Sequence, residues 1–161
     1  MLVQLLFKFI MYAVFGLSLE TVFSVAGIGR VSGVEIQRRT PKKYLEGFVS
    51  LYMIPVHGLG VLAFEAVFRS IQHWSIFFRY IVWCLLITGA EALAGFIYDR
   101  IFGFYSWDYY AQSKYKVFRR GYTLWTLLPL WGIAGLLLEG YVKIVNYVSP
   151  AVIDIVRGQI S

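Results

Sequence analysis

The chain has few charged residues and a single cysteine, and each shortage excludes a class of protein. Only 15% of its 161 residues are charged, whereas soluble domains have about 25%. Its 59% hydrophobic content exceeds the roughly 45–50% of soluble domains, so we expect a domain dissolved in lipid. Cys84 is the only cysteine, which excludes an intramolecular disulfide and a thiolate-rich metal site.

Several motifs of catalysis and nucleic-acid binding are also missing. The sequence has no serine–histidine–acid arrangement, no glycine-rich phosphate loop and no Walker motif, so we expect that the chain cannot hydrolyse a nucleotide by itself. No catalytic residue and no cofactor is assigned. The net charge of +6 comes with no basic stripe and no known nucleic-acid module, so we expect contact with anionic membrane lipid rather than nucleic acid.

Four apolar stretches predict the fold, at residues 2–28, 48–68, 80–98 and 122–148. The first is about 40 Å long as a helix, which is enough to cross a bilayer when tilted. Glu20 interrupts it and no convincing cleavage site follows, so it is predicted to be retained and not a signal peptide. The predicted fold class is all-α: one polytopic membrane domain, residues 1–161, built as a bundle of four transmembrane helices.

Three local features refine this prediction. Pro55, Gly58 and Gly60 in the second stretch indicate either a kink or a backbone that lies close to a neighbouring helix. The segment 99–121 is rich in aromatic rings that suit the headgroup region, so it is predicted to be interfacial. Apolar and charged residues alternate after Pro150, which predicts a short surface helix at the C-terminus.

The distribution of basic residues predicts orientation. Four spans put both termini on one side and the loops 30–46 and 99–121 on the other. Those two loops and their margins hold ten basic residues, namely Arg30, Arg38, Arg39, Lys42, Lys43, Arg100, Lys114, Lys116, Arg119 and Arg120. The opposite side holds five, namely Lys8, Arg69, Arg79, Lys143 and Arg157. The two loops are therefore predicted to be cytoplasmic, in the cytoplasmic membrane if the protein is bacterial.

Each predicted span carries one carboxylate: Glu20, Glu65, Glu91 or Glu139. A charge at the bilayer centre costs roughly 2.5–3.5 kcal/mol on insertion scales, so these side chains are expected to face the bundle interior or water. Glu20, His57 and Glu91 fall about eight or nine residues from the loop side, roughly 12–14 Å deep. Glu65 and Glu139 fall nearer the opposite side and are secondary candidates.

We therefore predict a polar intramembrane site formed by Glu20, His57 and Glu91. Two carboxylates and an imidazole at one depth can share a proton, bind a cation or hold a polar headgroup. Alternatively, they bond only to one another and fix how the helices pack. A histidine and two glutamates can also ligate zinc, but no zinc-binding spacing is present, so no metal is assigned.

Trp107, Asp108 and Tyr109 form a second candidate group. One interpretation is an aromatic anchor at the bilayer interface, with Asp108 capping a turn. The other is a lid over the polar site or a docking surface for a ligand or partner subunit.

Several short elements also resemble a known family. They are Tyr12-Ala13-Val14-Phe15-Gly16 with Glu20, Pro55-Val56-His57-Gly58, Glu91 with Gly95-Phe96, Trp107-Asp108-Tyr109, and Leu137-Leu138-Glu139. Over roughly residues 10–148 the chain resembles the putative ABC-transporter type IV (CmpB-like permease) family, which includes the transmembrane protein 229 proteins. Bacterial relatives commonly have Pro-x-Tyr-Gly where this chain has Pro-Val-His-Gly, so the resemblance implies no role for His57.

The resemblance and the polar residues together favour a small membrane subunit of transporter or permease type. Four spans barely enclose a path, so we expect a homo-oligomer or a partner membrane subunit. One alternative is a membrane scaffold whose glutamates are structural. A less favoured alternative is a membrane enzyme that modifies lipid headgroups.

Overall fold

The computed structural model describes residues 2–34, 40–41 and 44–158. Arg38, Arg39, Lys42 and Lys43 of the first loop lie outside this part. The helices are α1 (Leu2–Ala26), α2 (Ile28–Ser32), α3 (Met53–Ile71), α4 (Ile76–Phe102) and α5 (Leu128–Val156), with 3-10 helices η2 (Asp108–Gln112) and η3 (Trp125–Leu127). The described residues form no β-strand beyond an isolated bridge between Lys116 and Leu124. The predicted all-α class is confirmed.

Four of these helices are long and apolar enough to cross a membrane: α1, α3, α4, and η3 together with α5. This confirms the predicted number of spans, although their limits differ. The second span begins at Met53 and not at residue 48. The fourth continues to Val156, beyond the predicted end at residue 148.

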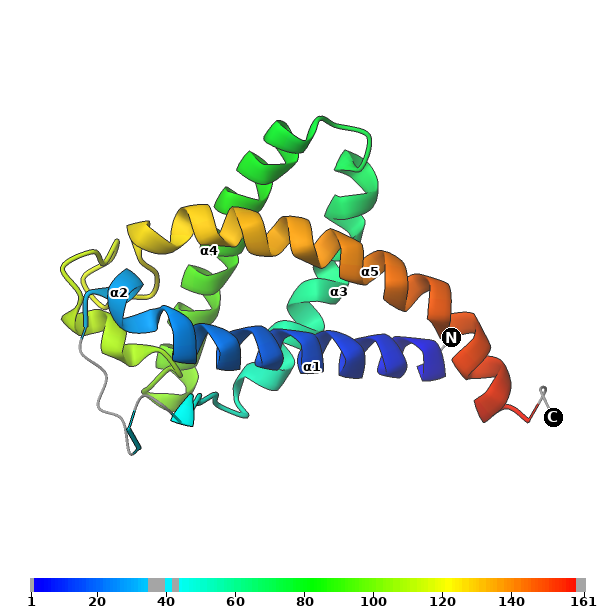
Figure 1. Cartoon of the computed structure of the whole chain (residues 1–161), viewed down its shortest axis with the longest axis horizontal. Coiled ribbons are helices and arrows are strands. Elements are labelled where there is room, and N and C mark those ends of the chain that lie inside the picture. The colour runs from blue at the N-terminus through cyan, green and yellow to red at the C-terminus, as the bar shows by residue number, and fades with distance from the viewer. Residues whose placement is uncertain (1, 35–39, 42–43, 159–161) are drawn as a thin grey trace.

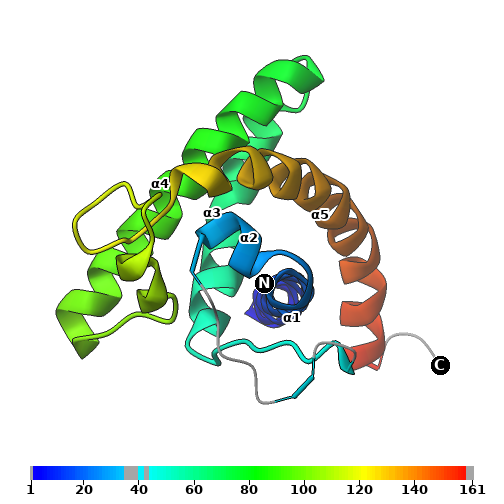
Figure 2. The same ribbon diagram turned by 60° about the vertical axis from the view of Figure 1, so that its left-hand side comes forward.

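The helices pack as two pairs, α1 with α3 and α4 with α5, and α1 also contacts α5. Figure 2 shows α1 nearly end-on, with α3 on one side and the arch of α5 on the other. In Figure 1 α2 and the connection 103–124 lie together at the left end of the molecule, whereas the first residues of α1 and the last of α5 lie at the right. We call these the loop end and the terminal end.

Glycines let the paired helices approach closely. An added Cβ at Gly58 in α3 would lie 2.3 Å from the ring of Phe9 in α1, and one at Gly135 in α5 would lie 2.3 Å from Trp83 in α4. Such distances leave no room for a side chain, so these positions fix the α1–α3 and α4–α5 contacts. The close approach predicted for the second span is therefore present.

Pro55 does not kink the second span, because it is the third residue of α3. The first four N–H groups of a helix have no partner within it, so the N–H that proline lacks is not needed there.

The expected separate helix after Pro150 is not formed, because α5 continues through Pro150 to Val156. Proline at position 150 leaves the carbonyl of Asn146 without its usual helical donor. Ser149 Oγ lies 3.4 Å from that oxygen as a replacement donor, and Gln4 Nε2 of α1 donates to Ser149 Oγ at 3.2 Å. These contacts tie the last turns of α5 to α1.

Residues 103–124, which we call the aromatic cap, join α4 to η3 at the loop end (Figure 1). Its rings were expected among lipid headgroups, but Tyr105, Trp107 and Tyr110 are buried, at 4%, 6% and 4% exposure. They pack with Met53 and Leu127 into a second hydrophobic cluster. The cap is thus largely a folded end of the bundle, and only rings such as Phe104 and Phe118 remain exposed.

Candidate functional site

The structure brings two of the three predicted site residues into contact. Glu20 of α1 and His57 of α3 lie with Oε1 and Nε2 3.1 Å apart. The angle is unsuited to a hydrogen bond, so the buried Nε2 has no hydrogen-bond partner within the described part of the chain. Gly16, one turn before Glu20, makes room for the imidazole, because a Cβ at Gly16 would lie 2.2 Å from His57 Cγ.

Glu91 of α4 is bonded to other residues. Thr123 Oγ1 donates a hydrogen bond to Glu91 Oε2, and Trp131 Nε1 donates to the same oxygen at 3.1 Å. Both donors are uncharged. Glu91 nevertheless lies close enough to Glu20 for their charges to interact, so the three predicted residues occupy one region of the bundle.

Two cap tyrosines adjoin this region, and only Tyr109 was predicted. Burial raises the pKa of Tyr109, and the negative charges of Glu91 and Glu20 raise it further. Burial raises the pKa of Tyr110 strongly, and Glu91 contributes again. Both phenols therefore stay protonated beside the carboxylates. The sequence signal for Tyr110 was its place directly after Tyr109; the structure puts both in the short 3-10 helix η2.

The other two carboxylates have permanent cations as partners. Glu65 is 3% exposed; Lys8 Nζ lies 3.1 Å from its Oε2 and Arg69 Nη2 lies 3.0 Å from the same atom. Tyr12 OH donates to Glu65 Oε1. Sequence reasoning missed Lys8 and Tyr12, because they are more than fifty residues away in the chain.

Glu139 of α5 is held in a similar way from α4. Arg79 Nη1 lies 3.0 Å from Glu139 Oε2, and Trp83 Nε1 donates to Oε1 at 2.7 Å. Arg79 and Trp83 are one helical turn apart, so one face of α4 supplies both partners. The carboxylate thus joins α5 to the first turns of α4.

The four span carboxylates therefore divide into two classes. Lysine or arginine neutralises Glu65 and Glu139. Within the part of the chain that the structure describes, Glu20 and Glu91 contact no lysine or arginine; their partners are the titratable His57 and the neutral Thr123 and Trp131. No permanent cation among the described residues therefore balances these two carboxylates.

The second predicted group lies in the cap. Trp107 is buried and its Nε1 donates to the carbonyl of Tyr122 at 2.8 Å. Asp108 begins η2 and is exposed. The cap is attached to α4 through Asp99, which accepts hydrogen bonds from Arg120 and Tyr122.

A group of three or more histidine, cysteine, aspartate and glutamate side chains suited to a metal ion was not found among residues 2–34, 40–41 and 44–158.

Comparison with known proteins gives one finding. The model of a family described as "Putative ABC-transporter type IV" matches residues 7–158, which is most of the chain. No curated protein and no solved structure gave a significant match.

Proposed function

The chain belongs to the putative ABC-transporter type IV family, and on that premise we propose that it is a small integral membrane subunit of transporter or permease type. Its polar intramembrane site is formed by Glu20, His57 and Glu91, all of which are half-buried. The transported or coupling species is a proton or a small cation. The subunit acts as an oligomer or with a partner membrane subunit.

The observation that carries this proposal is the missing positive charge beside Glu20 and Glu91. If both carboxylates are ionised, even a positively charged imidazole leaves the site with a net negative charge of one. Unpaired charge in a membrane interior is costly, so the site favours binding of a proton or cation. The paired Glu65 and Glu139 need no such ligand.

The position of the aromatic cap bears on how a ligand reaches the polar site. Tyr109 and Tyr110 adjoin the carboxylates on the loop end, and Trp107 is buried in the same cap. We therefore assign the cap as the lid of the polar site. A ligand that enters from the loop end has to displace or pass these rings.

The test is cation and proton flux in liposomes that contain the purified protein. A pH-sensitive dye reports proton movement, and Na⁺ and K⁺ gradients are imposed in separate arms. Glu20→Gln and Glu91→Gln should each abolish flux while the protein keeps its elution volume and thermal stability. Asp154→Asn, near the end of α5 and away from the site, is the matched control and should keep wild-type flux.

The alternative is a scaffold with structural glutamates, and the bonds of Glu91 favour it. Thr123 and Trp131 donate to one carboxylate oxygen from the cap and from α5, so Glu91 joins three segments. If the protein is a scaffold, liposomes that contain the wild-type protein show no more flux than empty liposomes. Glu91→Gln then lowers thermal stability or the yield of assembled protein. That pair of results would reject the transport proposal.

A further inference from the structure

An open depression of about 470 Å³ lies beside the loop end of α4, lined by Asp99, Arg100, Arg120 and Tyr122. Arg120 Nε and Nη2 donate to the two carboxylate oxygens of Asp99 at 2.9 and 2.6 Å. Tyr122 OH donates to Asp99 Oδ2 at 2.6 Å. Because the protein itself satisfies Asp99, this carboxylate does not repel an anion as an unpaired charge would.

The two arginines make the depression positive. Arg120 keeps 64% of its side chain exposed despite its ion pair, and a guanidinium has five N–H donors, of which Asp99 uses two. Arg100 forms no ion pair with the described residues; its guanidinium lies 5.2 Å from the centre of the Phe96 ring. Arg100, Arg120 and Asp99 together carry a net charge of +1. Several N–H groups of the two arginines are not used by Asp99.

Two aromatic rings adjoin the depression through Tyr122, which lines it. Tyr122 lies between Phe96 and Phe118, with ring centres 6.1 and 6.3 Å away. Phe96 and Phe118 are 43% and 49% exposed. Phe96 is one helical turn deeper in α4 than Arg100. A ligand here therefore meets cations in the depression and exposed aromatic rings beside it.

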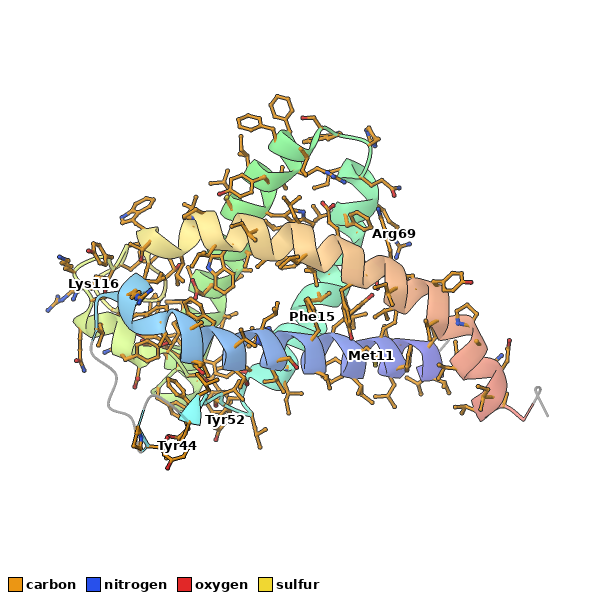
Figure 3. The ribbon with its side chains drawn as sticks, viewed as in Figure 1. Met11, Phe15, Tyr44, Tyr52, Arg69 and Lys116 are labelled. Carbon is orange, nitrogen blue, oxygen red and sulfur yellow. The ribbon has the colours of Figure 1, made fainter. Side chains whose placement is uncertain are left out.

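The cap carries further positive charge. Lys114, Lys116 and Arg119 are exposed on the same cap, and Lys116 is seen at the loop end in Figure 3. Basic side chains at the end of a span attract anionic headgroups, each contributing about 1 kcal/mol near the surface.

We propose that this depression binds an anionic phospholipid, with its phosphodiester between Arg100 and Arg120 and its upper acyl chain against Phe96 and Phe118. Arginine suits this group because its planar fork of donors matches two phosphate oxygens. A zwitterionic lipid carries a compensating cation, so it fits the positive depression less well. The inference rests on the four spans and not on the proposed transport.

The test is lipid binding to the full chain in detergent, followed by native mass spectrometry. The probes are phosphatidylglycerol, phosphatidylcholine of the same chain length, and inorganic phosphate. Arg100→Gln should weaken phosphatidylglycerol binding about fivefold, and Arg100→Lys should keep most of it. Arg157→Gln removes the same charge at the terminal end and should leave binding unchanged.

The proposal is supported if wild type and Arg157→Gln prefer phosphatidylglycerol to phosphatidylcholine and Arg100→Gln loses that preference. It is overturned if the two lipids bind equally, or if Arg100→Gln retains the full preference. Inorganic phosphate that displaces the lipid at equal concentration would also overturn it, because the site would then recognise a free anion. Failure of this test leaves the flux measurement on Glu20 and Glu91 untouched, so the two proposals are separable.

Discussion

Gly16 and His57 face each other across the α1–α3 contact so closely that a Cβ at position 16 would lie 2.2 Å from His57 Cγ. The same imidazole has its Nε2 3.1 Å from Glu20 Oε1. The absence of a side chain on Gly16 therefore sets where His57 lies. Both the α1–α3 packing and the position of His57 in the polar site therefore depend on Gly16.

Gly16→Ala is expected to displace the imidazole and to destabilise the protein by about 1–3 kcal/mol, the usual cost of an overpacked contact. The measurement is thermal unfolding in detergent. Gly60→Ala on α3 is the control, because an added Cβ there meets nothing within 4 Å, and it should keep or slightly raise stability. Equal melting of Gly16→Ala and wild type would contradict the close contact.

Two arginines bound to buried carboxylates should differ in importance. Arg79 is 18% exposed and is the only lysine or arginine paired with Glu139 among the described residues. Arg69 is 71% exposed, and Glu65 keeps Lys8 and Tyr12 without it.

Arg79→Met is therefore expected to cost about 3–5 kcal/mol, because it leaves a buried carboxylate without a cation. Arg69→Met should cost less than about 1 kcal/mol, as for an exposed ion pair. Chemical or thermal unfolding of the two variants in the same detergent measures the difference. A larger loss for Arg69→Met would show that the pairing is assigned wrongly.

Hydropathy was sufficient to predict the four spans, because a long apolar run is a local property of the sequence. Counting residues inward predicted one depth for Glu20, His57 and Glu91, and the structure brings Glu20 and His57 within 3.1 Å of each other. Local patterns could not show which helices are neighbours. The ion pairs of Glu65 with Lys8 and of Glu139 with Arg79 form between neighbouring helices. The sequence therefore could not predict which carboxylates have a cationic partner and which do not.

The cap shows a second limit of the sequence. An aromatic segment after a span resembles an interfacial belt, yet Trp107 donates its N–H to the Tyr122 carbonyl and is buried. Aromatic rings at a membrane interface and aromatic rings in a protein core come from the same residue types. Only the return of residues 121–124 over the end of α4 makes the difference, and no local pattern signals that contact.

The orientation predicted from basic residues is open to a direct test. In a Cys84→Ala background, Lys116→Cys at the loop end (Figure 3) should resist a membrane-impermeant thiol reagent in intact cells and react after lysis. His73→Cys, in the connection between α3 and α4, is the matched control and should react in intact cells. The reverse pattern would place the loop end outside the cell.

The cap tyrosines predict a loss of stability at alkaline pH. Burial raises the pKa of Tyr105 to about 12 and raises that of Tyr110 well above its ordinary value of 10. A phenol whose pKa is higher in the folded state than in the unfolded state stabilises the fold below about pH 10. That stabilisation is lost progressively as pH rises through the folded-state value.

Between about pH 10 and 12 the folded protein is thus expected to lose thermal stability while Tyr105 and Tyr110 remain protonated. Ultraviolet absorbance of tyrosinate, recorded along with unfolding, should show a late-titrating group of phenols that ionise only as the cap opens. Tyr110→Phe should remove one member of this group and flatten the alkaline decline. The idea fails if all tyrosines of the folded protein ionise near pH 10, because the cap phenols would then be open to water.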